Sequence, residues 1–192
     1  MMGKKNIEEL THLINQLNNE NELYISKIKD LIQHNKMDAS HSLISYFTYT
    51  FNISYHLEKE HMIIGTYHIT NQGTEPITNP HICIKFSQEH PFQFSGKILS
   101  RTAKMPMKVP DAWDRMNNPE DKEEYWLKPS EDIIIQPGEK LSFSNFQLKW
   151  KSHLTFTATV NGYAYSDEIN EGVASLNQIS MITSGKKEDE LE

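Results

Sequence analysis

Histidine and cysteine side chains are the first candidates for chemistry in this sequence. The chain has nine histidines and one cysteine, Cys83. His81 and Cys83 stand two residues apart in an alternating segment, so they share one face of an expected strand. With His68 from an adjacent strand they could form a zinc site, because thiolate and imidazole are common zinc ligands. No CxxC, HExxH or HxH spacing supports that site, so we favour solvent-facing strand residues and expect no cofactor.

Motifs for nucleophilic or nucleotide chemistry are missing from the sequence. There is no GxSxG elbow around a serine nucleophile, no P-loop and no GxGxxG. Acidic residues between 111 and 121 could offer oxygen ligands to calcium, but they lack the DxDxDG spacing of a calcium loop. We therefore expect a protein that is not an enzyme. A metal-dependent enzyme that uses the strand histidines is the alternative.

A long interruption at residues 100–130 holds the most conspicuous aromatic side chains. The strand rhythm is broken there by four prolines: Pro106, Pro110, Pro119 and Pro129. Connections of this length inside a compact domain are often functional, and a short helix is expected near residues 111–117. The aromatic residues could stack on a ligand, or they could plug one end of the domain, since large aromatic side chains usually end mostly buried. The candidate ligand surface consists of Trp113, Tyr125 and Trp126.

A two-residue period predicts the strands that must position these side chains. From residue 43 to residue 57, most odd positions are apolar or aromatic and polar residues fall between them. Such alternation is typical of a half-buried strand. Residues 62–70 are predicted to be its hairpin partner, and such a pair needs a second layer to bury its apolar face. Further strands are predicted near residues 81–86, 92–98, 133–135, 141–150, 154–164 and 176–182.

Turn residues mark the places where these strands reverse or change phase. Pro137 and Gly138 predict a type II turn, because proline fixes φ and glycine accepts a positive φ. The alternation slips near Ser144 and Asn145, which indicates a β-bulge. An Asn-Gly pair ending at Gly162 would suit a hairpin, but the alternation runs through it, so a continuous strand is preferred.

A helical period precedes the strands. Residues 6–35 contain neither glycine nor proline, and apolar residues recur there at alternating spacings of three and four. This pattern predicts a helix over residues 1–36 that forms a coiled coil, and so a homodimer, or that docks on its own domain or on a protein partner. The residues of the predicted seam are Ile7, Leu10, Ile14, Leu17, Asn21, Tyr24, Ile28 and Leu31.

Composition limits the size of the core and the kind of partner. The chain has 192 residues, a net charge of −7 and 37% hydrophobic residues, so a sizeable core is possible and binding to nucleic acid is disfavoured. No apolar run approaches the ~20 residues of a membrane span. The single cysteine suits a reducing compartment, and no apolar stretch follows the basic N-terminus as in a signal peptide. We therefore expect a cytoplasmic protein without a membrane partner.

Together these patterns predict a mainly β fold, an immunoglobulin-like antiparallel β-sandwich preceded by one long N-terminal α-helix. Residues 37–42 are the predicted linker, and residues 43–183 the predicted sandwich, with its long loop at 100–130. Residues 184–192 are expected to be a disordered charged tail. Helices do not alternate with the strands in this pattern, which argues against an α/β fold.

Several segments resemble bacterial immunoglobulin-like modules of the CARDB and DUF11 type. They are residues 65–73 with 76–79, residues 135–143 and residues 157–162, and they fall in the family's order across residues 43–183. The resemblance implies an adhesion or interaction fold and carries over no catalytic residues. The acidic insertion and the leading helix depart from the family pattern. Those modules are usually exported, whereas this sequence has no export signal.

These expectations lead to one functional prediction and two alternatives. The prediction is a non-enzymatic protein-interaction or scaffold module that associates through its N-terminal helix and presents a ligand surface on the 100–130 loop. One alternative is the metal-dependent enzyme. The other is an accessory subunit of a larger complex, with the helix docked on another protein.

Overall fold

The second of two compact units carries the fold. In the computed structural model the chain divides into Met1–Ser40 and His41–Glu192. The described residues are 40–53, 60–99, 109–151 and 155–184, together with Leu17, Glu22 and residues 24–27. The predicted tail therefore lies outside them from residue 185 onward. Within the described residues, no helix has both the length and the apolar character that a membrane span requires.

The first unit corrects the prediction of a long N-terminal helix. Over the residues described there, helix occurs at Leu17, Glu22 and residues 24–27, as one short helix. Leu17 and Tyr24 are 55% and 64% exposed, so the chain buries neither of these seam residues. A helix gains most of its stability from burying an apolar face, and heptad spacing alone does not supply that cover. The predicted long helix over residues 1–36, and the coiled coil with it, is therefore wrong. The other seam residues, Ile7, Leu10, Ile14, Asn21, Ile28 and Leu31, lie outside the described residues.

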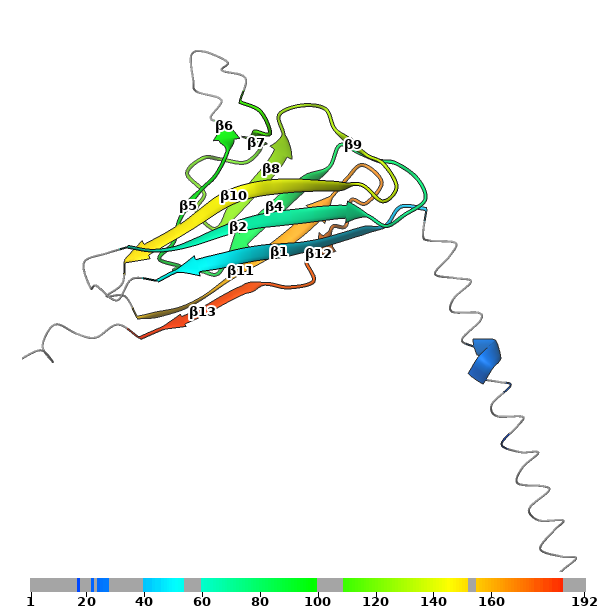
Figure 1. Cartoon of the computed structure of the whole chain (residues 1–192), viewed down its shortest axis with the longest axis horizontal. Helices are drawn as coiled ribbons and strands as arrows, with labels where there is room; N and C mark the ends of the chain where they lie inside the picture. The colour runs from blue at the N-terminus through cyan, green and yellow to red at the C-terminus, as the bar shows by residue number, and fades with distance from the viewer. Residues whose placement is uncertain are drawn as a thin grey trace, which may run out of the picture. The chain divides into compact units, whose positions relative to one another are not determined.

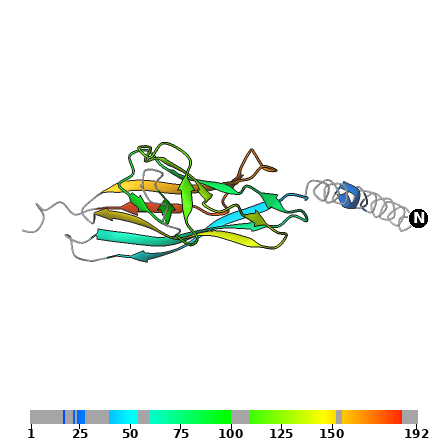
Figure 2. The same cartoon turned by 90° about the horizontal axis from the view of Figure 1, so that it is seen from above.

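Two sheets lie face to face in the second unit (Figure 1, Figure 2). The smaller sheet has the order β1-β2-β10-β5, formed by β1 Leu43–Asn52, β2 Glu60–Asn71, β10 Lys140–Lys151 and β5 Gln93–Ser95. The larger sheet has the order β12-β11-β4-β8-β7-β6, and β13 also pairs with β11. Its strands are β12 Val173–Ala174, β11 Phe156–Tyr165, β4 His81–Phe86, β8 Glu124–Pro129, β7 Trp113–Arg115, β6 Ile98–Leu99 and β13 Ile179–Thr183. A separate ladder joins β3 Ile77–Thr78 to β9 Ile134–Ile135.

Large apolar side chains from the facing sides of both sheets fill the space between them. Phe47, Ile63 and Tyr67 of the smaller sheet are at most 3% exposed, as are Ile84 and Val160 of the larger sheet. Along β2, and along β11 from Ala158 onward, every second residue is buried, so the period of two in the sequence matches the burial in the fold. The mainly β, two-layered part of the fold prediction is therefore confirmed.

Three local predictions are also confirmed. The register between β2 and β10 shifts at the predicted bulge, where Asn145 has a φ of 58°. Gly138 has a φ of 80°, in a turn closed by a 2.9 Å hydrogen bond from Glu139 N to Gln136 O. Strand β11 continues through Gly162 without a turn.

The interrupted region at residues 100–130 differs from its prediction. The helix expected near residues 111–117 is wrong, because β7 forms there and pairs with β8, a strand that the sequence pattern did not predict. Most strand pairs are antiparallel, but β6 and β7 are parallel. Prolines broke the alternation on which strand prediction depends, and pairing with β4 stabilises β8 in spite of them.

Candidate binding site on the larger sheet

The three residues of the zinc alternative are not brought together. His81 and Cys83 lie on β4 of the larger sheet, whereas His68 lies on β2 of the smaller sheet. Across the described parts of the chain, no group of three or more histidine, cysteine, aspartate or glutamate side chains could hold a metal ion. The sequence correctly placed His81 and Cys83 on one face of a strand, but it could not show that the sandwich separates them from His68.

Cys83 is buried although it faces outward, with an exposed fraction of 2%. In the sheet it stands between Tyr163 of β11 and Trp126 of β8, so large rings flank a short side chain on both sides. Burial, followed by the nearby Glu124 carboxylate, raises the pKa of the Cys83 thiol to about 12. A thiol that stays protonated at neutral pH is a poor nucleophile and a poor metal ligand.

We therefore expect Cys83 to resist alkylation in the folded chain. Near pH 8, iodoacetamide should react with it at least about a hundredfold more slowly than in denaturant, because folding lowers both the thiolate fraction and the access. The measurement is the rate of mass increase with and without denaturant. Equal rates in the two conditions would contradict the flanked, protonated thiol.

His68 belongs to a hydrogen-bonded row on the outer face of the smaller sheet. Its Nε2 lies 2.9 Å from the Thr48 hydroxyl and its Nδ1 lies 2.9 Å from the Ser142 hydroxyl. Ser142 and His68 have the spacing of a nucleophile and a base, but the second nitrogen faces a hydroxyl, where a catalytic triad has a carboxylate. Burial, followed by the charge of Lys140, lowers the pKa of His68. The neutral imidazole thus links three strands.

This lowered pKa predicts a pH-dependent contribution to stability. The unfolded chain binds a proton at His68 near the ordinary pKa of 6.5, whereas the folded chain resists that proton. The contribution is therefore complete above the unfolded pKa and is lost as the pH falls below it. We expect the stability advantage of the wild type over His68→Gln, measured by urea unfolding, to shrink between about pH 7.5 and pH 5.5. A difference in stability between the wild type and His68→Gln that does not change with pH would contradict this prediction.

The structure divides the three residues of the predicted ligand surface. Trp113 is 2% exposed and packs edge-on against Phe143, with ring centroids 5.5 Å apart. Tyr125 packs against Phe94 with centroids 4.5 Å apart, on the inner side of β8. Trp126 is half-buried on the outer side of the same strand. The idea that Trp113 is a free contact residue is therefore wrong, and Trp126 is the member of the set that can meet a ligand.

A cavity of about 990 Å³ opens beside Trp113. Its wall combines apolar side chains with charges of both signs, including Lys97 and Glu131. It also includes Leu99 and Val109, which border residues 100–108 outside the described chain. We therefore assign no site to this cavity.

The outer face of the larger sheet carries a cluster of half-buried rings. His81 stacks on Tyr165, with centroids 5.4 Å apart and planes at 13°. Trp126 lies 5.0 Å from Tyr165 and 6.4 Å from His81, centroid to centroid. Beside the rings, Lys85 Nζ donates to Glu124 Oε1 at 2.6 Å, and Trp126 Nε1 donates to Glu124 Oε2 at 3.1 Å. The aromatic face is defined here as a cluster of eight of the outward side chains of β4, β8 and β11: His81, Cys83, Lys85, Glu124, Trp126, Asn161, Tyr163 and Tyr165.

Arg115 holds the loop between β7 and β8 that leads into this face. Its guanidinium lies 4.2 Å from the centroid of the Tyr125 ring, in a cation–π contact. Its nitrogens donate to Asn117 Oδ1 and to the carbonyl oxygens of Pro119, Asp121 and Glu124. A planar donor with several N–H groups can satisfy this many acceptors at once, which a lysine could not do.

One acidic residue of that loop, Asp121, binds the loop's own backbone. The Asp121 carboxylate accepts hydrogen bonds from the N–H groups of Glu123 and Glu124 at 2.9 and 3.0 Å. Those hydrogen bonds lower the pKa of Asp121. Asn117 Oδ1 accepts from Trp126 N at 3.2 Å, so the same loop fixes the strand that carries the Trp126 ring.

A break in the edge of the larger sheet forms a small notch next to the aromatic face. Strands β12 and β13 both pair with β11, and Ser175 N still donates to Gly162 O of β11 at 2.8 Å, but residues 176–178 leave the sheet. They cross to β1 of the smaller sheet, where Leu176 N donates to Ser45 O at 2.8 Å. The Asn177 amide completes the link, since its oxygen accepts from Phe47 N at 2.8 Å and its nitrogen donates to Phe47 O at 3.0 Å.

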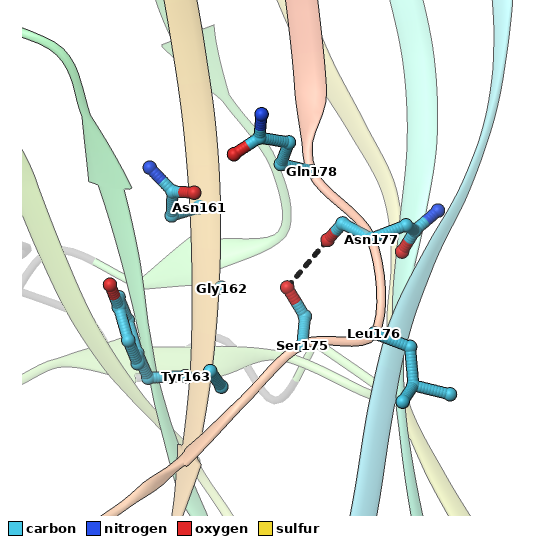
Figure 3. A pocket seen from close by; sticks show the side chains of 8 residues that line it. Asn161, Gly162, Tyr163, Ser175, Leu176, Asn177 and Gln178 are labelled. Carbon is cyan, nitrogen blue, oxygen red and sulfur yellow. Dashed lines mark hydrogen bonds between the residues drawn. The ribbon is translucent and has the colours of Figure 1, made fainter.

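The space left behind is a cavity of about 170 Å³, seen from close by in Figure 3. In that view the chain swings toward β1 at Asn177, away from Asn161 and Tyr163 on β11. The lining residues are Asn161, Gly162, Tyr163, Ala174, Ser175, Leu176, Asn177 and Gln178. Sequence analysis missed this notch. A partial signal existed, because Asn161, Tyr163 and Tyr165 occupy the solvent-facing positions of a predicted strand.

Comparisons with known proteins add little to this geometry. No protein family and no curated protein matches the sequence. One similar solved structure is described as "AvmM Catalyzes Macrocyclization in Alchivemycin A Biosynthesis"; it is 11% identical, covers 78% of this chain and 91% of that chain, and has a TM-score of 0.35. A likeness at that level carries no argument about fold or function. The resemblance to CARDB and DUF11 modules therefore stays a prediction.

Proposed function

We propose that the β-sandwich is a non-enzymatic binding domain whose ligand lies on the aromatic face. The observation that carries the proposal is the cluster of the His81, Trp126 and Tyr165 rings, half-buried on a paired sheet. Side chains held on a rigid sheet lose little conformational entropy when a ligand arrives. Rings that combine an apolar body with a polar tip are frequent at binding surfaces, where a few of them supply most of the affinity.

Further features support a binding role over a catalytic one. Lys85 and Glu124 of the face bind one another at 2.6 Å, so neither charge is held ready for catalysis. The thiol of Cys83 stays protonated, and His68 lies on the other sheet. A binding domain is also the kind of role that the immunoglobulin-like resemblance implies. The metal-dependent enzyme would have to draw its ligands from separate sheets.

The test uses the full chain on an array of neutral oligosaccharides and on an array of extended peptides. The variant is Trp126→Ala, and the matched control is Tyr46→Ala, which removes a half-buried ring from the outer face of the smaller sheet. A ligand of the wild type should bind the Trp126→Ala variant at least about tenfold more weakly. It should bind the Tyr46→Ala variant with unchanged affinity.

Three results would overturn this proposal. They are the absence of binding on both arrays, a ligand that binds Trp126→Ala as tightly as the wild type, and chemical turnover of an arrayed ligand. Circular dichroism of both variants establishes that a loss of binding is not a loss of fold.

A further inference from the structure

The notch beside the aromatic face has two polar groups without a protein partner. Within the part of the chain that the structure describes, no hydrogen bond engages the Asn161 amide or the Tyr163 hydroxyl. Both side chains are half-buried and line the same cavity. Neither group is among the buried side-chain atoms without a hydrogen bond, so both reach solvent and can bond to a ligand in the cavity.

The chemistry of the lining is neutral and rich in hydrogen-bonding groups. The lining has no charged residue. Its Asn177 amide is bound to Phe47 and its Ser175 hydroxyl donates to Asn177 O at 2.6 Å, so the polar side chains left to bind a ligand are those of Asn161, Tyr163 and Gln178. Gln178 uses one N–H on Ser180 Oγ at 3.0 Å, which leaves its carbonyl oxygen as an acceptor. Amides and hydroxyls both donate and accept, which matches the vicinal hydroxyls of a sugar.

The surrounding charges agree with a neutral ligand. The nearest basic side chain across the sheet is that of Lys85, which is opposite Asn161 in the ladder and is paired with Glu124. Neither a carboxylate nor a phosphate would therefore find an unpaired cation on this part of the face. The adjacent rings of Tyr163 and Tyr165 offer apolar surface for the C–H face of a sugar ring.

The size of the cavity limits the ligand. A volume of about 170 Å³ corresponds to about six waters and is below the roughly 300–1,000 Å³ of pockets for drug-sized molecules. One ring of a saccharide fits this space, and a longer chain would have to continue over the neighbouring rings of the aromatic face.

We infer that the notch is a subsite for one residue of a neutral saccharide, held by Asn161 and Tyr163, with further sugars lying on the aromatic face. This inference rests on the proposed function, because it assigns a ligand class to the same surface. Few contacts at a single subsite imply a weak monosaccharide Kd, on the order of millimolar.

The test is a titration of the ¹⁵N-labelled full chain with the methyl glycosides of glucose, galactose and N-acetylglucosamine. At least one glycoside should cause saturable shifts confined to the amides of residues 161–163 and 175–178. Asn161→Ala should weaken that binding by about tenfold, and Tyr163→Phe serves as the second variant if the first does not fold. Thr157→Ala, on the same face of β11 and outside the notch, should change the affinity less than about twofold.

The outcomes separate this inference from the function on which it rests. Saturable binding that falls with Asn161→Ala supports the saccharide subsite. The absence of binding by all three glycosides, or shifts outside the notch, overturns it. If extended peptides bind and Trp126→Ala abolishes that binding, the binding domain stands and the saccharide subsite falls. If neither class binds, both fall.

Discussion

Replacing Asn71 with alanine should lower the free energy of unfolding by about 3 kcal/mol. The side chain is fully buried, and its nitrogen donates to Glu75 O at 2.8 Å and to Ile135 O at 2.9 Å. Its oxygen accepts from Gly73 N at 2.8 Å. Alanine would leave these backbone groups without partners and open a void among them. The measurement is urea unfolding, and the expected result is a lower midpoint with an unchanged slope.

The controls for this variant are its neighbour and its closest isostere. Gln72→Ala removes an exposed side chain next in sequence and should change stability by less than about 0.5 kcal/mol. Asn71→Asp keeps the acceptor for Gly73 but aims a buried carboxylate at two carbonyl oxygens. It should destabilise at least as much at neutral pH and recover part of the loss in acid, where the group is protonated. If Asn71→Ala were as stable as Gln72→Ala, the stabilising role of the Asn71 side-chain hydrogen bonds would be contradicted.

Replacing Gly162 with alanine should also destabilise the domain, by about 2–3 kcal/mol. A Cβ at this position would lie 2.3 Å from Tyr67 Cε2 and 2.9 Å from Phe47 Cζ, inside the core. Without that clash the change would stabilise β11, since glycine weakens a strand. The sign of the effect therefore reports the close approach of the Tyr67 ring.

A compensating substitution makes this second prediction specific. Tyr67→Leu removes the ring atoms that an alanine at position 162 would meet. The double variant should lose at least about 1 kcal/mol less than the sum of the two single variants in thermal or urea unfolding. If the effects of the two single variants simply add, the destabilisation by Gly162→Ala does not come from a clash with the Tyr67 ring.

How far the sequence predicts this fold depends on how strictly each segment alternates. β1, β2 and β11 follow a two-residue period that reflects their half-buried faces, and their positions could be predicted. The bulge at Asn145 and the turn at Gly138 could be predicted because each needs a particular backbone conformation. The heptads before residue 36 gave a wrong prediction because a pattern of apolar residues does not reveal whether anything covers them.

The candidate site was harder to predict because its members are joined by pairing across the sheet. Tyr125 and Trp126 differ by one position, and that step decides which ring enters the core and which reaches the outer face. The prolines around β8 interrupt the alternation, so the sequence pattern did not show which of the two rings faces outward. The notch depends on hydrogen bonds between Asn177 and Phe47, which are 130 residues apart, and no local pattern announces such a contact.

The ring of Trp126 can report directly on whether the aromatic face binds a ligand. It has three tryptophans, of which Trp113 and Trp150 are 2% and 3% exposed, while Trp126 lies half-buried on the aromatic face. The measurement is ¹⁹F NMR of the full chain labelled with 5-fluorotryptophan and titrated with the oligosaccharides and the extended peptides of the two arrays. The account predicts a saturable shift of the Trp126 resonance, with those of Trp113 and Trp150 unchanged. A Trp126 resonance that stays in place with every ligand, or one that moves only together with the two buried tryptophans, would contradict it.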